Sequence, residues 1–183
     1  TVLAITPSTA YVEVNGDFTF DFTGGVPPVT YSITAGGGTI VDSAVGTYTA
    51  PSTAGSATVR VTDALGHTSS TTSITIHDSL ILTPSTITMG INTTQTFTGT
   101  GGVGTLTYAM YSGNGSINSS TGLYTAPPGA GTEVIQVSDT IGNVVTSTIT
   151  VVSSLTISPA TLKLPIFSTA TFSSILGVPG YTY

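Results

Sequence analysis

The chain has 183 residues, of which 39% are hydrophobic and only 5% are charged, and its net charge at neutral pH is −6. Arg60 and Lys163 are the only basic residues, which excludes nucleic acid and anionic membrane surfaces as partners because both require several cationic contacts. The absence of cysteine excludes disulfides and thiolate metal sites, and no apolar run approaches the roughly 20 residues of a membrane-spanning helix. The chain begins with Thr1 rather than Met, so we expect a mature product or a fragment.

The sequence repeats itself with a period of roughly 75 residues, the size of a small domain. The phrase around Pro7 returns around Pro84, 77 residues later, and again around Pro159, 75 residues after that. The spacing predicts one module over residues 1–77, a second over 78–153 and an incomplete third over 154–183. The linkers between them are short, which favours an end-to-end arrangement.

The first strand signals surround an Asn-Gly pair. Residues 18–22 alternate strictly, so that three phenylalanines share one face of a strand. Asn15 and Gly16 just before it favour a tight hairpin turn. On opposing strands of such a hairpin, Glu13 and Asp17 would approach each other, and we interpret them as the flanks of a solvated turn rather than as a catalytic pair.

Alternating segments follow along the rest of each module. They occupy residues 29–33, 57–61 and 73–76, with counterparts at 106–110, 133–137 and 148–151. β-branched and aromatic residues fill them, and no segment has a helical period. About seven short strands per module, with turns every 8–12 residues, predict an antiparallel β-sandwich. The aromatic residues that recur are expected in the cores: Phe20, Tyr31 and Tyr48 in the first module, and Phe97, Tyr108 and Tyr124 in the second.

Three phrases carry a resemblance to a known family. Gly-x-Tyr-Thr-Ala-Pro occupies 46–51 and 122–127, the hairpin phrase Val-Thr-Asp-x-x-Gly occupies 61–66, and Ile-Thr-Pro-Ser opens the chain at 5–8. The chain resembles the bacterial immunoglobulin-like repeats that occur in tandem in adhesins of the invasin and intimin type, in other surface fibres and in phage tail proteins. The resemblance implies tandem Ig-like β-sandwiches that serve mostly as spacers.

Few residues are candidates for chemistry. Asp63 recurs as Asp139 at the start of the last hairpin turn, and we interpret both as acceptors that hold the turn, with an ion ligand as the alternative. His67 and His77 do not recur and are expected to be exposed polar residues on different loops. No nucleophile has a recurring base beside it. We therefore predict a protein that is not an enzyme, with no cofactor and no bound metal.

Two tyrosines are the best candidates for a contact surface. Tyr11 and Tyr111 do not recur between modules, and strand alternation points both outward, opposite Val12 and Met110. Partners expected for such a chain are neighbouring repeats or identical subunits, with a glycan or a host receptor as a further possibility.

The incomplete third module contains only the first strands of a sandwich. These strands leave an apolar set uncovered: Leu155, Ile157, Leu162, Leu164, Phe172, Ile175 and Val178. We expect this segment to be ordered only with more of its own chain or with a neighbouring subunit that adds a strand.

The sequence therefore predicts a non-catalytic stalk or spacer of an extracellular bacterial surface fibre or adhesin. The alternatives are a filament subunit completed by strand addition between chains, and an Ig-like module that binds a glycan or receptor, including one from a phage tail.

Overall fold

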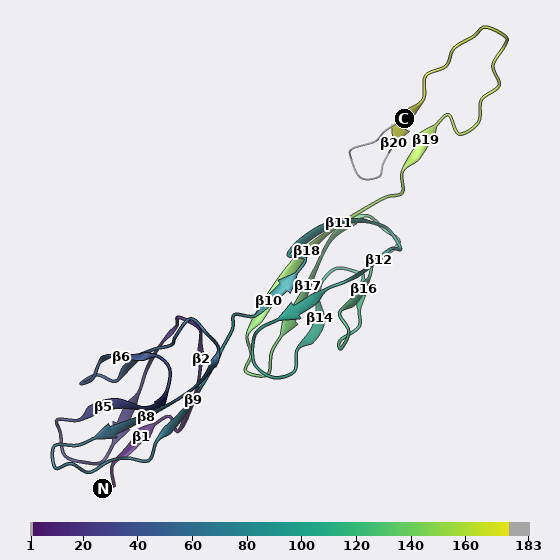
Figure 1. Cartoon of the computed structure of the whole chain (residues 1–183). Helices are drawn as coiled ribbons and strands as arrows, with labels where there is room; N and C mark the ends of the chain where they lie inside the picture. The colour runs from purple at the N-terminus through teal and green to yellow at the C-terminus, as the bar shows by residue number, and fades with distance from the viewer. Residues whose placement is uncertain (1, 176–183) are drawn as a thin grey trace. The chain divides into compact units, whose positions relative to one another are not determined.

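The computed structural model describes residues 2–175, which contain only strands, turns and irregular segments. The chain divides into two compact units, Thr1–Ser79 and Leu80–Tyr183 (Figure 1). The all-β architecture confirms the predicted fold class. Within the described residues no helix is long and apolar enough to cross a membrane.

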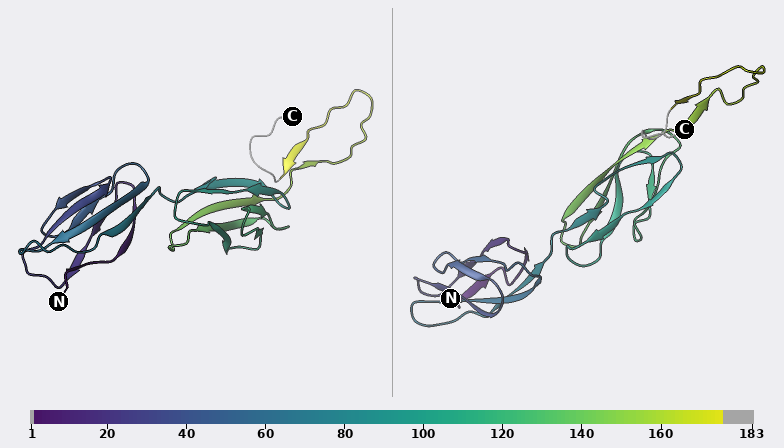
Figure 2. Two further views of the ribbon diagram at one scale, coloured as in Figure 1. Left: turned by 60° about the horizontal axis from the view of Figure 1, so that its bottom comes forward. Right: turned by 45° about the horizontal axis from the view of Figure 1, so that its top comes forward.

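Nine strands form the first unit, which we call repeat 1. They are β1 (Ala4–Thr6), β2 (Thr9–Glu13), β3 (Asp17–Thr19), β4 (Asp21–Thr23), β5 (Thr30–Gly36), β6 (Thr39–Asp42), β7 (Thr47–Thr49), β8 (Gly55–Thr62) and β9 (Thr72–His77). One layer is a four-stranded sheet in the order β2-β9-β8-β5, and facing it are the sheets β3-β7-β6 and β1-β4. Figure 2 shows the strands of the repeat from two further sides.

The strands β10–β18 form repeat 2 on the same plan. They are β10 (Ile81–Thr83), β11 (Thr86–Gly90), β12 (Thr94–Thr96), β13 (Thr98–Thr100), β14 (Thr107–Ser112), β15 (Ser116–Ile117), β16 (Leu123–Thr125), β17 (Gly131–Ser138) and β18 (Val144–Val152). The sheets β11-β18-β17-β14, β12-β16-β15 and β10-β13 match those of repeat 1 strand for strand.

Each repeat begins with a strand that changes sheets at a proline. Before Pro7, β1 pairs antiparallel with β4; after it, β2 pairs parallel with β9. The hydroxyl of buried Thr72 on β9 donates to the Pro7 carbonyl at 2.5 Å, and buried Ser147 on β18 donates to the Pro84 carbonyl at 2.7 Å. One side-chain hydroxyl therefore fixes the place where the chain passes from one sheet to the other. Each sandwich is otherwise antiparallel but contains one parallel strand pair.

The Asn15-Gly16 turn also differs from the prediction. β2 and β3 belong to different sheets, so the turn carries the chain from one layer to the other and is not a hairpin. Asn15 adopts a φ of 59°, and the Gly16 amide donates to the Glu13 carbonyl at 2.8 Å. Glu13 accepts a hydrogen bond from Ser79, whereas Asp17 accepts one from Thr49. Glu13 and Asp17 thus bond to different partners, on the two sides of a turn between two sheets.

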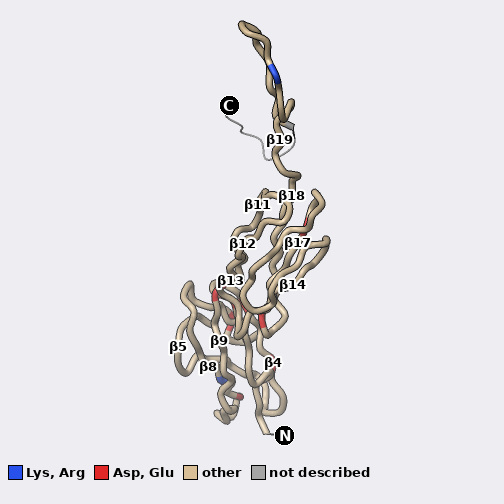
Figure 3. Tube along the Cα trace, turned by 90° about the vertical axis from the view of Figure 1, so that its right-hand side faces the viewer, with Lys and Arg blue, Asp and Glu red and all other residues tan. Residues whose placement is uncertain are grey.

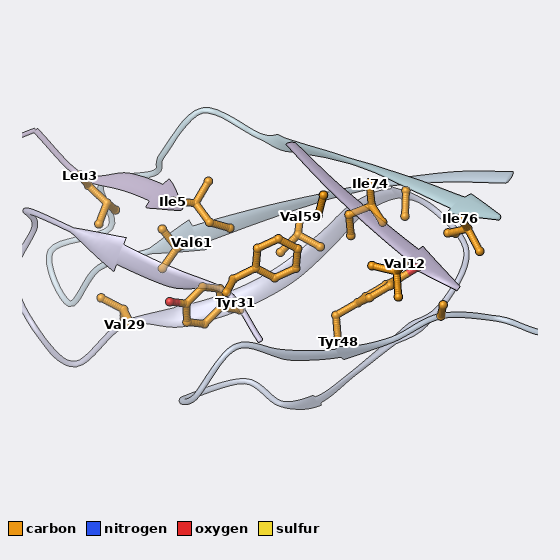
Figure 4. Packing of buried hydrophobic residues seen from close by; sticks show 14 residues of the cluster. Leu3, Ile5, Val12, Val29, Tyr31, Tyr48, Val59, Val61, Ile74 and Ile76 are labelled. Atoms are coloured by element: carbon orange, nitrogen blue, oxygen red, sulfur yellow. The ribbon is translucent and has the colours of Figure 1, made fainter. Parts of the chain in front are cut away.

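The recurring aromatic residues lie in the cores, as predicted. Phe20 and Tyr48 are almost fully buried in repeat 1, as are Phe97 and Tyr124 in repeat 2. Figure 4 shows Tyr31 and Tyr48 among the aliphatic side chains of the repeat 1 core, including those of Val59 and Ile74. At Phe20 the predicted strand 18–22 splits into β3 and β4, which belong to different sheets. Such splits raise the number of strands per repeat from the expected seven to nine.

The segment after repeat 2 forms a single hairpin. In it, β19 (Thr156–Ser158) pairs antiparallel with β20 (Ser173–Ile175), in a register equivalent to that of β1 with β4. No strand equivalent to β2 forms between β19 and β20. In a complete repeat β2 pairs with the last strand, β9, and the described part of this segment contains no counterpart of that strand. The expected apolar set is exposed as far as the described side chains extend: Leu155, Ile157, Leu162, Leu164 and Phe172. The side chain of Ile175 and the whole of Val178 lie outside the described residues.

Candidate functional site

A buried carboxylate joins two loops at one end of repeat 1. Asp63 follows β8, and its Oδ1 accepts hydrogen bonds from the amides of Leu65 (3.0 Å) and His67 (2.9 Å). Its Oδ2 accepts from the amide of Val26 (3.1 Å), in the loop between β4 and β5. The carboxylate thus closes its own turn and ties it to a loop 37 residues earlier.

Asp139 repeats this arrangement in repeat 2. Its Oδ1 accepts from the amides of Ile141 (3.1 Å) and Asn143 (2.9 Å), and its Oδ2 accepts from the amide of Val103 (2.9 Å). The side chain of Asn143 also donates to Oδ2 at 2.9 Å, where repeat 1 has the His67 imidazole at 3.1 Å. The predicted role as a turn acceptor is confirmed for both aspartates.

These contacts favour the ionised carboxylates. Burial acts to raise the pKa of Asp63, but the His67, Val26 and Leu65 hydrogen bonds outweigh it and lower the pKa below the ordinary value. The pKa of Asp139 is lowered in the same way, against the effect of burial. Since N–H groups occupy the oxygens, neither aspartate offers a free face to a cation, and nowhere in residues 2–175 do three His, Cys, Asp or Glu side chains gather as metal ligands would.

A hollow of about 480 Å³ lies beside the Asp63 turn. It is lined by Val2, Leu3, Gly25, Asp63, His67 and Thr68. The imidazole of His67 is largely exposed, as predicted, and its Nδ1 faces Asp63. With the Asp63 oxygens already bonded, the remaining polar side chains of the lining are those of His67 and Thr68.

His77 was predicted to be exposed, and that prediction was wrong. Its side chain is 8% exposed, because β9 extends through it and pairs it with Glu13. Its Nδ1 lies 3.1 Å from the Asp78 carbonyl. His77 therefore belongs to the folded end of the strand and not to a loop.

Sequence reasoning missed a second buried carboxylate of repeat 2, Glu133 of β17. It is 3% exposed and accepts the amide hydrogens of Asn114 (2.9 Å) and Gly115 (2.6 Å), in the loop between β14 and β15. Gly113 just before them has a φ of 111°, and a Cβ there would collide with the carboxylate. The available signal was a lone glutamate at an inward position of an alternating strand, where repeat 1 has Ala57.

The core tyrosine of repeat 2 lies beside this carboxylate. Burial first, and then the neighbouring Glu133, raise the pKa of Tyr124 to about 12. The matching tyrosine of repeat 1, Tyr48, instead donates its hydroxyl to the Gly37 carbonyl at 2.9 Å, and burial raises its pKa. The two cores thus bond to the equivalent loop in different ways: the Tyr48 hydroxyl donates to a loop carbonyl in repeat 1, and the Glu133 carboxylate accepts from loop amides in repeat 2.

The two candidate contact tyrosines are exposed, but they belong to different repeats. Tyr11 is 49% exposed on β2, at one edge of its four-stranded sheet. Tyr111 is 68% exposed on β14, at the edge occupied by β5 in repeat 1. They therefore occupy opposite edges of equivalent sheets, and neither repeat combines them into one patch.

Charged residues are distributed very unevenly (Figure 3). Repeat 1 contains exposed carboxylates, among them Asp17, Asp21 and Asp42. Between residues 80 and 154 the only charged residues are Glu133 and Asp139, and both are buried. The described surface of repeat 2 is therefore uncharged.

Comparison with solved structures identifies the fold. A 282-residue C-terminal fragment of intimin, solved in complex with the intimin-binding domain of the translocated intimin receptor, matches with a TM-score of 0.63 and 17% sequence identity. The match covers 87% of this chain and 67% of the fragment. At this identity the likeness establishes the fold alone, and it confirms the Ig-like fold that the sequence resemblance implied.

Two further structures are more distant. The D00-D0 domain of intimin has a TM-score of 0.34 at 14% identity, covering 80% of this chain and 99% of that one. Domains 4 and 5 of the S-layer protein SbsC have a TM-score of 0.33 at 15% identity, covering 82% and 98%. No model of a protein family and no characterised protein sequence matches the chain.

Proposed function

We propose that the chain is a load-bearing spacer of an extracellular bacterial surface fibre. The observation that carries this proposal is the parallel pairing of the first and last long strands in each repeat. β2 pairs with β9 over five residue pairs, from Thr9 opposite Ser73 to Glu13 opposite His77. β11 pairs with β18 in the same way, from Thr86 to Gly90.

Parallel terminal strands have a mechanical consequence. When the two ends of a repeat are pulled apart, the paired strands slide along each other, and all their hydrogen bonds bear the load together. In a hairpin pulled open at its end, the bonds would break one after another. The arrangement thus suits a repeat that must stay folded under tension.

The side chains that recur between the repeats support the same role. Phe20, Tyr48 and Asp63 of repeat 1, like their counterparts in repeat 2, bond or pack inside the fold. Phe20 and Tyr48 are almost fully buried, and the Asp63 carboxylate, which lines the hollow, already accepts hydrogen bonds from three backbone amides. We infer a non-catalytic function for these shared positions, which is what a spacer built from repeated modules requires.

Force spectroscopy on the full chain tests this proposal. We expect two unfolding events, each releasing about 20–25 nm of chain, from the extended length of a repeat less its folded length. Ile91→Pro, directly after β11, removes the amide that donates to the Val152 carbonyl of β18 at 3.0 Å, and it should lower the unfolding force of repeat 2 while repeat 1 serves as the internal control. An unchanged force in folded Ile91→Pro protein, or extension without force peaks, would contradict a role under tension.

A second candidate function is a filament subunit, and the exposed apolar side chains of residues 155–172 favour it. Ile157 and Phe172 align with Ile5 and Phe20, which are core residues of repeat 1. Strands from another copy would cover them in a filament, and strands of the same chain would cover them in a stalk. Light scattering distinguishes the two, since a filament subunit polymerises through this segment and residues 1–153 alone would remain monomeric.

A further inference from the structure

The outer face of the four-stranded sheet in repeat 2 is an array of neutral polar side chains. The strands β11, β18 and β17 point Thr86, Thr148 and Val134 outward in one row. The next row consists of Thr88, Thr150 and Thr132. A further row contains Thr146 and Gln136. We call these eight residues the threonine face.

The threonine face has no charge on it or near it. All six of its threonines are exposed: Thr86, Thr88, Thr132, Thr146, Thr148 and Thr150. The two charged residues of repeat 2, Glu133 and Asp139, are buried and bonded to backbone amides. A charged partner would find no complementary group here, whereas an uncharged partner with many hydroxyls would find donors and acceptors throughout.

An exposed aromatic ring stands at the edge of this face. β14 has a bulge between Met110 and Ser112, and Tyr111 is the extra residue. Met110 packs against the core, whereas the Tyr111 side chain is 68% exposed. Ser112 pairs with Val134 of the threonine face, so the bulge brings the ring to the end of its first row. Bulges are a recurrent means of redirecting a side chain.

Repeat 1 has the same bulge with a different residue. Its bulge lies between Ile33 and Ala35 on β5, and the extra residue is Thr34. The Thr34 hydroxyl bonds to the Thr58 hydroxyl at 2.7 Å and so remains on its own sheet. The bulge therefore belongs to the shared frame, and the exposed ring is particular to repeat 2.

We propose that the threonine face, with Tyr111 at its edge, binds a neutral saccharide. A sugar ring has an apolar C–H face, which stacks on an exposed aromatic ring, and hydroxyls around its rim, which bond to threonine and glutamine side chains. The uncharged surroundings exclude uronic and sialic acids as preferred ligands, because no cation would pair with their carboxylates. A saccharide site on the sheet face leaves both ends of the repeat free to join its neighbours in a fibre.

The experiment is affinity electrophoresis of the full chain in gels that contain a neutral polysaccharide (amylose, galactomannan or arabinoxylan), with alginate as the anionic comparison. Tyr111→Thr installs the repeat 1 residue at the same bulge and should weaken retardation by about tenfold, the loss expected for one aromatic stack. Thr148→Asp puts a charge in the centre of the threonine face and should abolish retardation. Tyr11→Thr, which removes an exposed tyrosine from repeat 1, is the matched control and should leave it unchanged.

Circular dichroism melting of each variant separates folding from binding, and light scattering separates saccharide binding from self-association. We expect the variants to melt like the parent chain and to differ only in retardation by the neutral gels. The proposal is overturned if none of the three neutral polysaccharides retards the parent chain, or if Tyr111→Thr is retarded equally. It is also overturned if alginate is bound in preference, or if Tyr111→Thr changes only the solution mass, which would assign the face to contact between copies.

Discussion

Replacing Glu133 by alanine should selectively destabilise repeat 2. Alanine is the residue that repeat 1 carries at this position, as Ala57, so the fold accommodates it on a strand. The replacement removes the carboxylate oxygen that accepts hydrogen bonds from the backbone amides of Asn114 (2.9 Å) and Gly115 (2.6 Å).

The magnitude follows from these hydrogen bonds. Each bond to a charged acceptor contributes about 1.5–3 kcal/mol, which gives about 3–6 kcal/mol if both amides lost their partner completely. Asn114 is exposed, so water can solvate part of the opened loop. We therefore expect a loss of about 2–4 kcal/mol in the free energy of unfolding, a large share of the stability of a small domain.

Hydrogen exchange followed by mass spectrometry measures this loss in each repeat separately. Amides of β17 and β18 should exchange about 30- to 800-fold faster in Glu133→Ala, while those of β8 and β9 in repeat 1 report any general effect. Thr132→Ala, on the exposed side of the same strand, is the matched control and should change exchange little. Unchanged exchange in Glu133→Ala would refute the assignment of Glu133 as the anchor of this loop. Equal acceleration in both repeats would refute the claim that its effect is confined to repeat 2.

Three further predictions concern repeat 2. Ser147→Ala removes the buried hydroxyl that fixes the strand crossing and should cost about 1–3 kcal/mol in chemical denaturation, whereas exposed Thr148→Ala should cost little. Burial and Glu133 raise the pKa of Tyr124 in the folded protein from its ordinary value of 10.0 to about 12. The contribution of Tyr124 to the free energy of unfolding should therefore be complete below pH 10 and lost as the pH rises toward 12. Tyrosinate absorbance recorded during alkaline unfolding would show this loss. The pKa of Asp139 in the folded protein is lowered from 3.8, so its contribution to the free energy of unfolding should be complete above pH 3.8 and lost as the pH falls further. Asp139→Asn should remove this contribution to the fall of the melting temperature in acid.

The alternating segments could be predicted from the sequence because strand periodicity reports which face of a strand is buried. Phe20 and Tyr48 recur at inward positions, and both lie in the core. Periodicity does not report which strand pairs with which. The parallel pairing of β2 with β9 brings together residues more than 60 positions apart, and no local pattern in either segment specifies that choice. For the same reason Asn15 and Gly16, a good hairpin pair by composition, form a turn between two sheets.

The bonding partners of buried polar side chains could not be predicted from the sequence. Glu133 occupies an inward position that periodicity assigns to an apolar residue, and its partners are amides in a loop 18–19 residues away. His77 lies beyond the alternating run but is buried because its strand continues beside β2. In both cases the determining contact is with backbone groups, which carry no sequence signal.

The differences between the two repeats locate any function beyond that of a spacer. Positions that recur, such as Asp63 and Asp139, hold loops together, so a ligand would have to compete with backbone amides for their oxygens. We therefore expect a binding function at a position where the two repeats share the backbone geometry but differ in the exposed side chain. The β-bulge on β5 and β14 meets this condition, because the backbone distortion is present in both repeats while Thr34 is replaced by Tyr111. Tyr111→Thr should therefore remove binding from repeat 2 without altering its core, whereas Thr34→Tyr alone should not confer binding on repeat 1, because Arg60 lies at an outward position of its equivalent sheet.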